Sequence, residues 1–596
     1  MPGKVDKNAL ASRIREIEGL SNDEKSALLE LLNTRKKYGL VWEEKAEAVE
    51  ELLSEKLPVF TEVPAKRITA KPLEKDPGKL DLFGDKGKDA APAPDHIIVE
   101  GDNLHALTAL QYTHAGKIDV IEIDPPYNTG NKDFIYNDSY VDKEDSWRHS
   151  KWLCFMSKRL KLAKTLLKET GVIFIHIDDN EQAQLKLLCD EIFGEQNHIA
   201  DFIWKSRQII DSRNQTFASI DHEFVIAFGK TPNSILRGKA SDKEKYSNPD
   251  KDHRGPWMSN SILGLADADN RPNLHYTLVD PETSYEYPCP PATGWRYSPD
   301  TMATKLAEKR IVFPKKKDGR PREKKFLSEL KSDFTGFSSI LSEDAGYTLN
   351  GTRELREIFG EGLFGFPKPV SLIKMVVQQS IPSDSIILDF FAGSGTTLHA
   401  TMALNAEDGG SRRCILVTNN ENNICEEVTY ERNKRVIQGY TKQNGEAVAG
   451  LTNNNLRYYK TDFIEREPTL KNRKALTRAA IDLLCIRENC YTSYKEFDTK
   501  EIRVFSGKEH ELMIIFDPEN IDTAIEIIQK LLKRCKVYIF SPGHYAFDDE
   551  FEPVMGKIEL CALPEAIYQA YKAVLPKAKR RLYEEPVQEE AVAEIG

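Results

Sequence analysis

Apolar residues in the middle of the chain alternate between two patterns. Short runs rich in β-branched residues, typical of strands buried on both faces, occur at 96–102, 117–123, 171–178, 222–229, 385–388 and 414–418. Between them, apolar residues recur at helical spacing over 147–169, 179–193, 370–380 and 398–404. This alternation predicts an α/β fold with a doubly wound, mostly parallel sheet that helices cover on both faces.

The two ends of the chain differ from this middle part. Residues 1–70 have helical patterns, with Ser21 and Glu24 spaced as a capping box, and predict a small helical domain. Residues 71–95 are rich in proline, glycine and lysine, which predicts a linker. Residues 455–596 mix strand and helix patterns and predict a separate C-terminal α/β domain, whose role we take to be contact with a second copy or another subunit.

The alternation also stops between 232 and 355, where polar residues, turns and scattered aromatic residues replace it. The predicted core therefore has a first half at 96–231 and a second half at 356–454, with residues 232–355 inserted between them. Aromatic and basic residues in such an insertion suit reading bases and holding phosphates. We therefore expect the insertion to be a target-recognition domain.

Composition narrows the class of protein. The 596 residues are 40% hydrophobic and 30% charged, as in ordinary globular proteins of several domains. No apolar run is long enough for a membrane span, and the first residues do not have signal-peptide character, so we expect a cytoplasmic protein without membrane contact. The nine cysteines lack the spacing of zinc sites or disulfide frameworks. A net charge of −11 means that any nucleic-acid contact must use a local basic face.

The motif Asp124-Pro125-Pro126-Tyr127 directly follows the strand predicted at 117–123. Two prolines forbid continuation of the strand and leave a stiff turn at the edge where open α/β sheets bind ligands. The Asp124 carboxylate and the Pro125 carbonyl are two acceptors that suit an exocyclic amino group, and the Tyr127 ring can stack on a base. From these four residues alone, an ordinary turn that ends a strand is about as well supported as a pocket for a base.

A second motif, Asp389-Phe390-Phe391-Ala392-Gly393-Ser394-Gly395-Thr396-Thr397, lies between a predicted strand and a predicted helix. Its two glycines let the backbone approach a ligand, and the helix N-terminus offers unpaired N–H groups. The spacing is neither that of a dinucleotide fingerprint nor that of a P-loop. Glu421 follows the next predicted strand, at 414–418, where a carboxylate is placed to bind ribose hydroxyls.

Together, F-x-G-x-G and D-P-P-Y resemble the amino-group DNA methyltransferases that use S-adenosylmethionine. The resemblance covers roughly residues 95–440, and the order of the motifs is similar to the β class. Residues 124–131, with Ser146-Trp147 and Trp152, are most similar to the modification subunits of type III restriction systems. The resemblance implies a Rossmann-like methyltransferase sheet, in which the glycine turn holds the cofactor and D-P-P-Y holds a flipped base.

The resemblance also implies roles for individual residues. Asp124, Pro125, Pro126 and Tyr127 would be catalytic, and the reaction needs no metal. Residues expected near S-adenosylmethionine are Asp102, Phe366, Lys368, Asp389, Phe391, Ala392, Gly393, Ser394, Gly395, Thr396 and Glu421. Implied partners are double-stranded DNA, a second copy in a homodimer and a restriction helicase-nuclease subunit.

Two regions are predicted to contact DNA. Phe134 and Tyr136 lie in a loop predicted at 128–140, where they either stack on bases or anchor the loop. Residues 305–331 hold eleven lysines and arginines against four acidic residues, and a solvated face is the alternative to a DNA contact. The residues we expect to bind phosphates are Lys315, Lys316, Lys317, Arg320 and Arg322. Pro288-Cys289 is similar to the nucleophile motif of cytosine-C5 methyltransferases, but we expect Cys289 to be an ordinary cysteine.

The sequence therefore predicts a site-specific DNA methyltransferase that modifies adenine N6 in duplex DNA after base flipping, as a type III modification subunit. Asp at the first motif position favours adenine, since the family usually has Ser there for cytosine N4. Alternatives are an enzyme acting on cytosine N4 or on RNA, and a specificity subunit with an inactive pocket that positions a nuclease. The intact motifs argue against the last.

Overall fold

The computed structural model describes residues 40–45, 47–70, 93–137, 139–212, 216–265, 267–314, 319–379, 382–543, 545–572 and 574–575, with Ile14, Ile17 and Lys25. Ser21, Glu24 and most of the predicted linker lie outside the described residues. The chain forms two compact units, of which the smaller is Arg237–Phe337 and the larger contains the rest. The smaller unit lies within the insertion that we predicted at 232–355.

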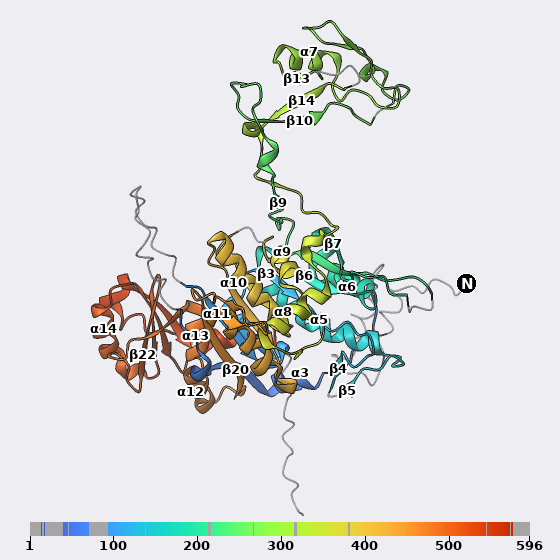
Figure 1. The fold of residues 1–596 in the computed structure, drawn as a ribbon. Coiled ribbons are helices and arrows are strands. Elements are labelled where there is room, and N and C mark those ends of the chain that lie inside the picture. The colour runs from blue at the N-terminus through green and yellow to red at the C-terminus, as the bar shows by residue number, and fades with distance from the viewer. Residues whose placement is uncertain are drawn as a thin grey trace, which may run out of the picture. The chain divides into compact units, whose positions relative to one another are not determined.

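A nine-stranded sheet forms the centre of the larger unit, in the order β1-β20-β2-β17-β16-β3-β6-β8-β7 (Figure 1). Its strands are β1 (Lys56–Glu62), β2 (Asp95–Glu100), β3 (Ile118–Ile123), β6 (Leu167–Ile177), β7 (His198–Lys205), β8 (His222–Gly229), β16 (Ile386–Asp389), β17 (Arg413–Thr418) and β20 (Asn455–Glu465). The strands from β20 to β6 are parallel to one another, whereas β1 and β8 run antiparallel to their neighbours. The predicted mostly parallel α/β sheet is confirmed.

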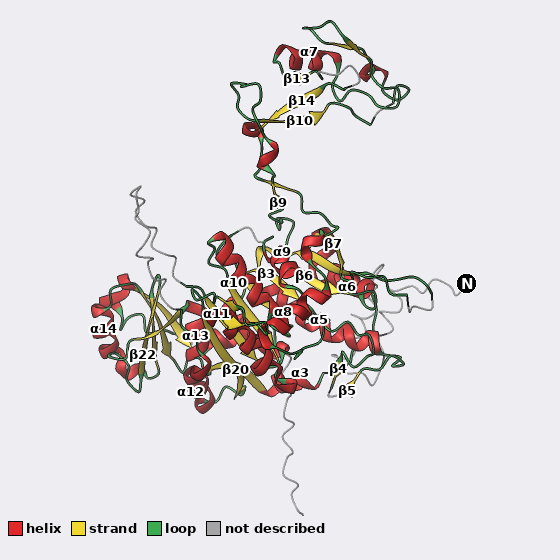
Figure 2. Ribbon diagram, in the orientation of Figure 1, coloured by secondary structure: helices red, strands yellow, loops and turns green. Residues whose placement is uncertain are grey.

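Helices cover both faces of this sheet (Figure 2). All six residues of β3 are buried, and Ile121 and Ile123 belong to the core that includes α4 (Asn103–His114) and α5 (Arg148–Leu166). Helix α9 (Val370–Val377) contacts both β3 and α10 (Thr396–Asp408). Successive residues of a strand point to opposite faces, so a strand with helices on both sides becomes a continuous apolar run.

The two ends of the chain join this sheet, which corrects two predictions. Strand β1 follows α3 (Ala48–Glu55) and pairs with β20, so the region 1–70 is not purely helical. Strand β20 lies between β1 and β2, so the domain boundary predicted after 454 is wrong. These pairings join residues far apart in sequence, which local patterns do not show. No strand forms at 366–368, since Pro367 and Pro369 lack the N–H that a sheet requires.

The C-terminal region adds a second sheet of five strands, with a parallel β23-β24-β25 part. Its strands are β21 (Cys490–Ser493), β22 (Ile502–Gly507), β23 (Glu511–Ile515), β24 (Cys535–Phe540) and β25 (Ile558–Leu563), with α14 (Ile521–Lys530) after β23. Helix α13 (Ile481–Glu488) contacts α4, and Leu512 and Ile514 share the core of the large sheet. This region is therefore not a separate domain.

The smaller unit has its own small core. Its main sheet consists of β10 (Trp257–Ser261), β14 (Arg322–Phe326) and β13 (Ile311–Val312), all antiparallel, with α7 (Pro299–Ala307) nearby in sequence. The buried core residues are Ile262, Leu278, Tyr287, Trp295, Met302 and Ile311. At the two ends of the unit, β9 (Lys239–Ala240) pairs with β15 (Phe334–Thr335), so the chain enters and leaves at one place.

Candidate functional site

The Asp124–Tyr127 turn leaves the carboxyl end of β3 and is held from behind by α5. The Trp152 indole Nε1, which is buried, donates to the Pro126 carbonyl at 2.7 Å. The next residue, Asn128, has a φ of 58° and donates through its amide to Glu181 at 2.5 Å and to the Arg148 carbonyl at 3.3 Å. These contacts fix the turn, so its acidic and aromatic side chains are positioned in advance.

Four polar side chains meet in front of this turn. The Lys368 Nζ lies 2.9 and 3.0 Å from the two carboxylate oxygens of Asp124 and 2.8 Å from the Tyr127 hydroxyl oxygen. That hydroxyl donates to the Glu223 carboxylate at 2.9 Å, and Lys368 lies 3.4 Å from the same carboxylate. The cluster joins β3, the start of β8 and the segment before α9. Both oxygens of Asp124 face the ammonium group.

Charges set the protonation of this cluster. Burial lowers the pKa of Lys368, but the carboxylates of Asp124 and Glu223 outweigh burial and hold that pKa above the ordinary lysine value. Burial, with Asp124 and Glu223 adding to it, raises the pKa of Tyr127 well above its ordinary value. At neutral pH, Lys368 is therefore a cation and Tyr127 a neutral donor.

A cavity of about 280 Å³ adjoins the turn at the carboxyl ends of β2, β3, β16 and β17. It is lined by Glu47, Ala48, Val49, Asp102, Asn103, Pro126, Asp133, Phe134, Ile135, Tyr136, Asn137, Phe155, Arg159, Phe390, Phe391, Thr418, Asn419 and Glu421. The structure thus brings together Asp102, Phe391 and Glu421, three residues predicted from widely separated motifs. Pro126 belongs to both the turn and the cavity wall.

Aromatic rings and one buried cation form much of the cavity wall. The Phe155 ring lies 5.2 Å from the Phe134 ring and 5.8 Å from the Phe391 ring, centroid to centroid. Arg159 is buried, pairs with Glu47 at 2.9 Å, and lies 3.6 Å from Asp102. Asp102 also caps α4 by accepting from the Leu104 N–H at 2.8 Å. No local sequence pattern indicated a role for Arg159 or Phe155, which lie inside one long helix.

The glycine turn is held by a segment that sequence analysis did not single out, from η9 (Ile424–Tyr430) to α11 (Glu431–Gln438). Thr429 donates to the Gly393 carbonyl at 2.6 Å, and Asn433 donates to the Gly395 carbonyl at 3.2 Å. Gly395 has a φ of 74°, and a Cβ there would lie 2.5 Å from the Asn433 amide nitrogen. Only glycine fits this position.

Most of the glycine motif supports the cavity without lining it. Arg432 donates to the hydroxyls of Ser394 and Thr396 at 2.9 and 2.7 Å. Among the predicted motif residues, Phe391 lines the cavity, whereas Asp389, Ala392, Gly393, Ser394, Gly395 and Thr396 do not. Their role as direct ligand contacts therefore stays a prediction.

Two carboxyl groups are buried below the glycine turn. The Thr397 hydroxyl oxygen lies 2.6 Å from Asp389 and 2.7 Å from Glu122, and Asp389 also accepts from the Phe391 N–H at 2.9 Å. One hydroxyl has a single hydrogen, so it can donate to only one of the two carboxyls. Burial and the nearby Glu122 raise the pKa of Asp389 well above its ordinary value. Asp389 thus fixes the start of the turn from below.

The structure separates Phe366 and Lys368 from the cavity, although we predicted both to contact the cofactor. Phe366 is 81% exposed, with a φ of 53°, and neither residue is in the cavity wall. Lys368 contacts Asp124 instead. The two prolines that flank Lys368 make this segment a stiff loop that reaches the Asp124–Tyr127 turn.

The prediction that Phe134 and Tyr136 are free to stack on DNA bases is wrong for this structure. Their exposed fractions are 1% and 8%, and both line the cavity. The Tyr136 hydroxyl donates to the Lys45 carbonyl at 2.8 Å. The loop alternative, in which these rings anchor the segment, agrees with their burial.

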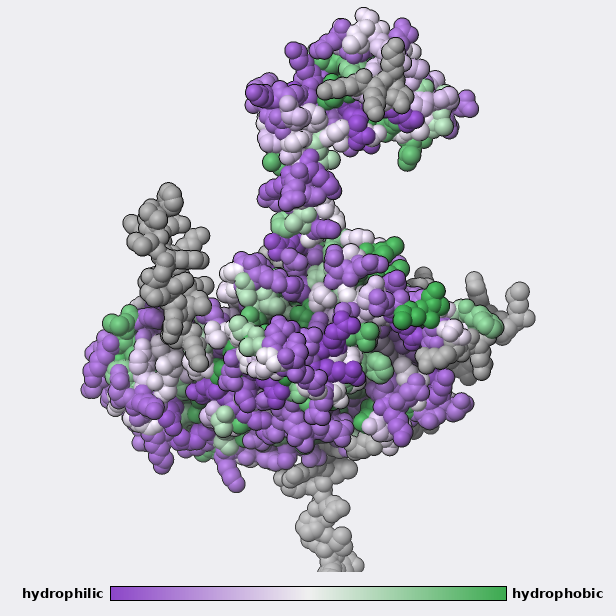
Figure 3. Space-filling model, in the orientation of Figure 1, coloured by the Kyte–Doolittle hydropathy of each residue, from purple (hydrophilic) through white to green (hydrophobic). Residues whose placement is uncertain are grey.

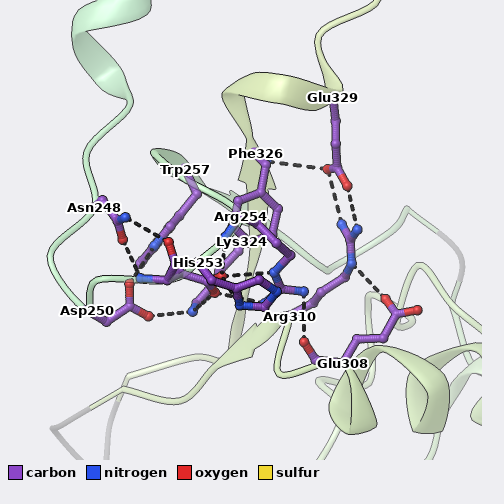
Figure 4. Close-up of polar contacts among 11 residues, drawn as sticks. Asn248, Asp250, His253, Arg254, Trp257, Glu308, Arg310, Lys324, Phe326 and Glu329 are labelled. Atoms are coloured by element: carbon purple, nitrogen blue, oxygen red, sulfur yellow. Dashed lines mark hydrogen bonds and ion pairs between the residues drawn. The ribbon is translucent and has the colours of Figure 1, made fainter.

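The basic run of the smaller unit is partly neutralised by its own carboxylates. Arg254 and Lys324 both bind Asp252, at 2.8 Å each, and their hydrogen bonds hold the pKa of Asp252 well below its ordinary value. Arg310 binds Glu308 and Glu329 (Figure 4). These cations stabilise the unit, which a count of charges along the sequence does not reveal.

The structure describes two of the five residues that we predicted to bind phosphates. Lys315, Lys316 and Lys317 lie outside the described residues. Arg320 and Arg322 are exposed, and Arg322 Nε donates to the Ser259 hydroxyl at 2.6 Å. Their contact with DNA stays a prediction.

Other groups in the described part of the chain add no further chemistry. None of its helices is long and apolar enough to cross a membrane. Within the same residues, no group of three or more His, Cys, Asp or Glu side chains is arranged to hold a metal ion. All nine cysteines lie in described segments and are free thiols, and Cys289 donates to the Thr293 carbonyl at 3.0 Å.

Comparisons with known proteins agree with this site. A sequence model of a family described as DNA methylase matches residues 118–442, more than half of the chain. The type III restriction-modification enzyme StyLTI Mod subunit of Salmonella typhimurium is 35% identical over 353 residues, which are 54% of this chain and 52% of that subunit. The type II methyltransferase M.KpnI of Klebsiella pneumoniae is 34% identical over 360 residues, 57% of this chain and 84% of that enzyme.

The match to the StyLTI Mod subunit thus spans only about half of that subunit's length. Among solved structures, the cytosine-N4-specific PvuII DNA methyltransferase is similar to this protein at 15% sequence identity and a TM-score of 0.28. The match covers 60% of this chain and 97% of the PvuII enzyme. The family match covers both the Asp124–Tyr127 turn and the glycine turn. The chain therefore belongs to the N6/N4 DNA methylase family.

Proposed function

We propose that this protein transfers the methyl group of S-adenosylmethionine to the N6 atom of adenine in duplex DNA, at a specific sequence and after base flipping. One observation carries this proposal: Pro126 is shared by the Asp124–Tyr127 turn and by the wall of the cavity. A base held by the turn and a cofactor held in the cavity would therefore meet at one wall. Orientation of two bound reactants supplies much of the rate in such reactions.

The turn suits the amino group of a base. The Asp124 carboxylate and the Pro125 carbonyl are acceptors for its two hydrogens, and they stabilise the positive charge that develops on nitrogen during methyl transfer. In the present arrangement Lys368 occupies both oxygens of Asp124, so a bound base must displace or share this ammonium group. Tyr127 remains a neutral ring that can stack on the base.

The cavity suits S-adenosylmethionine. Its volume of about 280 Å³ is close to the lower end of the range for small-ligand pockets. Phe155 and Phe391 offer apolar surfaces for the adenosyl group, while Asp102 and Glu421 offer carboxylates to hydroxyl and ammonium groups. When bound, the cofactor supplies an electrophilic methyl on a sulfonium.

Adenine is proposed over cytosine on the identity of residue 124. Asp is usual in this family for adenine and Ser for cytosine N4, whereas both bases present two N–H donors to the turn. The smaller unit, with exposed Arg320 and Arg322, is the proposed target-recognition domain.

The proposed partners are duplex DNA, a second copy of the chain and a restriction subunit. Support for the last comes from relatives that are Mod subunits of type III restriction-modification enzymes. An enzyme acting on bacterial chromosomal DNA would work in the cytoplasm.

The test is transfer of labelled methyl from S-adenosylmethionine to duplex DNA of mixed sequence. The product nucleosides are then separated, and the modified positions are mapped by sequencing. We expect N6-methyladenine at one recurring sequence. Methylcytosine would keep the enzyme class and overturn the assignment of Asp124, and transfer to RNA alone would overturn the substrate. Cofactor binding without any transfer would favour a specificity subunit.

A further inference from the structure

The loop between β7 and β8, residues 206–221, leaves the sheet beside the Asp124–Tyr127 turn. Strand β7 is parallel to β6 and β3, so its last residue, Lys205, lies at the same edge as Asp124. After the loop the chain returns at His222, and the next residue, Glu223, accepts the hydrogen bond from Tyr127. The loop therefore starts and ends next to the base side of the site.

This loop exposes large apolar side chains to solvent. Ile209 is 80% exposed, Ile210 73% and Phe217 93%. In Figure 3, hydrophobic groups gather on the surface around the position of β7 in Figure 1. Exposed apolar residues that cluster beside a functional site mark a surface that something covers.

Hydrogen bonds join the two ends of this loop, whereas its large apolar side chains are exposed to solvent. The Arg207 N–H donates to the Asp221 carbonyl at 3.2 Å, the Asp211 N–H donates to the Ser219 hydroxyl at 2.8 Å, and that hydroxyl donates to Asp221 at 2.5 Å. Phe217 also has a φ of 56°, in the left-handed region that bulky residues rarely adopt. Such strain at an exposed phenylalanine points to a function for the ring.

We propose that Ile209, Ile210 and Phe217 form a wedge that enters the base stack of duplex DNA and fills the space left by the flipped target base. This inference rests on the proposed function, since it requires duplex DNA at the Asp124–Tyr127 turn. The flat, apolar faces of bases match these side chains, and apolar wedges between base steps are a general means of unstacking DNA. Exposed Lys205 and Arg207 flank the wedge and suit the adjacent phosphates, and Arg207 would exchange its ion pair with Asp211, at 3.1 Å, for such a contact.

A wedge and a surface that only binds DNA differ in how their loss affects paired and unpaired targets. It offsets the free energy of unpairing and unstacking the target base, so it matters for a paired target and not for one that is already unpaired. Its loss should therefore be rescued when the target adenine faces an abasic site.

The experiment compares single-turnover methyl transfer on two duplexes that carry the mapped recognition sequence. In one the target adenine is paired, and in the other it lies opposite an abasic site. The variants are Phe217→Ala and the double variant Ile209→Ser with Ile210→Ser. The control variant is Leu532→Ser, which removes a side chain that is 95% exposed just after α14.

We expect transfer to the paired duplex to fall by about tenfold or more in the wedge variants, and transfer to the abasic duplex to stay within about twofold of wild type. Fluorescence of 2-aminopurine at the target position should rise less with these variants than with wild type or Leu532→Ser. If the wedge variants methylated the paired duplex at the wild-type rate, the wedge proposal would be wrong. The exposed apolar surface would then bind another partner.

Equal losses on both duplexes would also overturn the wedge, because they would mean that the loop affects binding or folding. Failure of the wild-type chain to methylate any DNA is a separate outcome, which refutes the proposed function itself.

Discussion

The two sides of the candidate site are built from different interactions. On the base side, Asp124, Lys368, Tyr127 and Glu223 form one charged cluster whose atoms lie 2.8 to 3.4 Å apart. On the cofactor side, apolar and polar side chains contribute equally to the cavity wall, and the glycine turn beside it is held by hydrogen bonds to carbonyl and hydroxyl groups. Pro126 is the point where the two sides meet.

This difference teaches which property each side controls. A charged cluster of this kind supplies acceptors and a fixed arrangement of charge to the amino group that reacts. The glycine turn beside the cavity tolerates almost no added atom, because a Cβ at Gly395 would lie 2.5 Å from the Asn433 amide nitrogen. Changes on the base side should therefore alter the rate of transfer, and changes on the cofactor side should alter cofactor affinity.

The largest effect is expected for Asp124→Ala. Loss of one acceptor for the developing charge should lower single-turnover transfer on the order of a hundred- to a thousandfold. Cofactor affinity, measured by calorimetry, should stay near wild type, because Asp124 does not line the cavity. A large loss of cofactor affinity in this variant would show that the two sides are not separable.

The next largest effect is expected for Gly395→Ala. Its Cβ would lie 2.5 Å from the Asn433 amide nitrogen, in a backbone with a φ of 74°. We expect cofactor affinity to fall by about tenfold or more, because relief of the contact with Asn433 would shift the glycine turn.

Gly409→Ala is the matched control for Gly395→Ala. Gly409 has a φ of 71°, but a Cβ there meets no atom within 4 Å. It carries the same backbone strain without the contact to Asn433. If both variants bind cofactor equally, the tight fit of the glycine turn has no role in binding.

A change in pH dependence is expected for Lys368→Met. In wild type, the raised pKa values of Lys368 and Tyr127 keep the ammonium charged and the phenol neutral, and both states are lost only as the pH rises above the ordinary values of 10.5 and 10.0. Neither residue should therefore produce a limb in the pH–rate profile between about pH 7 and 10.

Without Lys368, the carboxylates of Asp124 and Glu223 lie near each other with no cation between them. The acidic limb of the pH–rate profile should therefore move to higher pH in Lys368→Met. An unchanged profile would mean that Lys368 leaves the cluster before the reaction and does not influence it.

The smallest effect is expected for Phe366→Ala. This side chain is 81% exposed and absent from the cavity wall, so cofactor affinity should stay within about twofold of wild type. A tenfold loss of affinity would restore the cofactor role that the sequence suggested for Phe366.

Sequence analysis found those parts of the site that are local in the chain. Asp124 and Phe391 each follow a buried strand directly, and parallel strands bring their carboxyl ends to one edge, so their proximity could be predicted. The contact between Lys368 and Asp124 joins residues 244 positions apart, and no local pattern specifies it. The same holds for Arg159 with Glu47, and for the pairing of β1 with β20.

Burial was the other property that patterns did not reveal. Phe134 and Tyr136 lie in a polar segment that predicts an exposed loop, yet both rings are buried against the cavity. Three cations described in the basic run of the smaller unit, Lys305, Arg310 and Lys324, are likewise bound to carboxylates at least 18 positions away in sequence, such as Lys324 to Asp250. Long-range packing decides both, and a single sequence contains no direct record of it.

The pairing of β9 with β15 has a consequence for how such proteins change over evolutionary time. Strands Lys239–Ala240 and Phe334–Thr335 form one short ladder. The two segments that connect residues 237–337 to the rest of the chain therefore lie side by side. Recombination at the two ends of this segment would exchange the whole unit without breaking any strand of the nine-stranded sheet. Under the proposed role of this unit in target recognition, such an exchange would change DNA specificity and leave the chemistry unchanged.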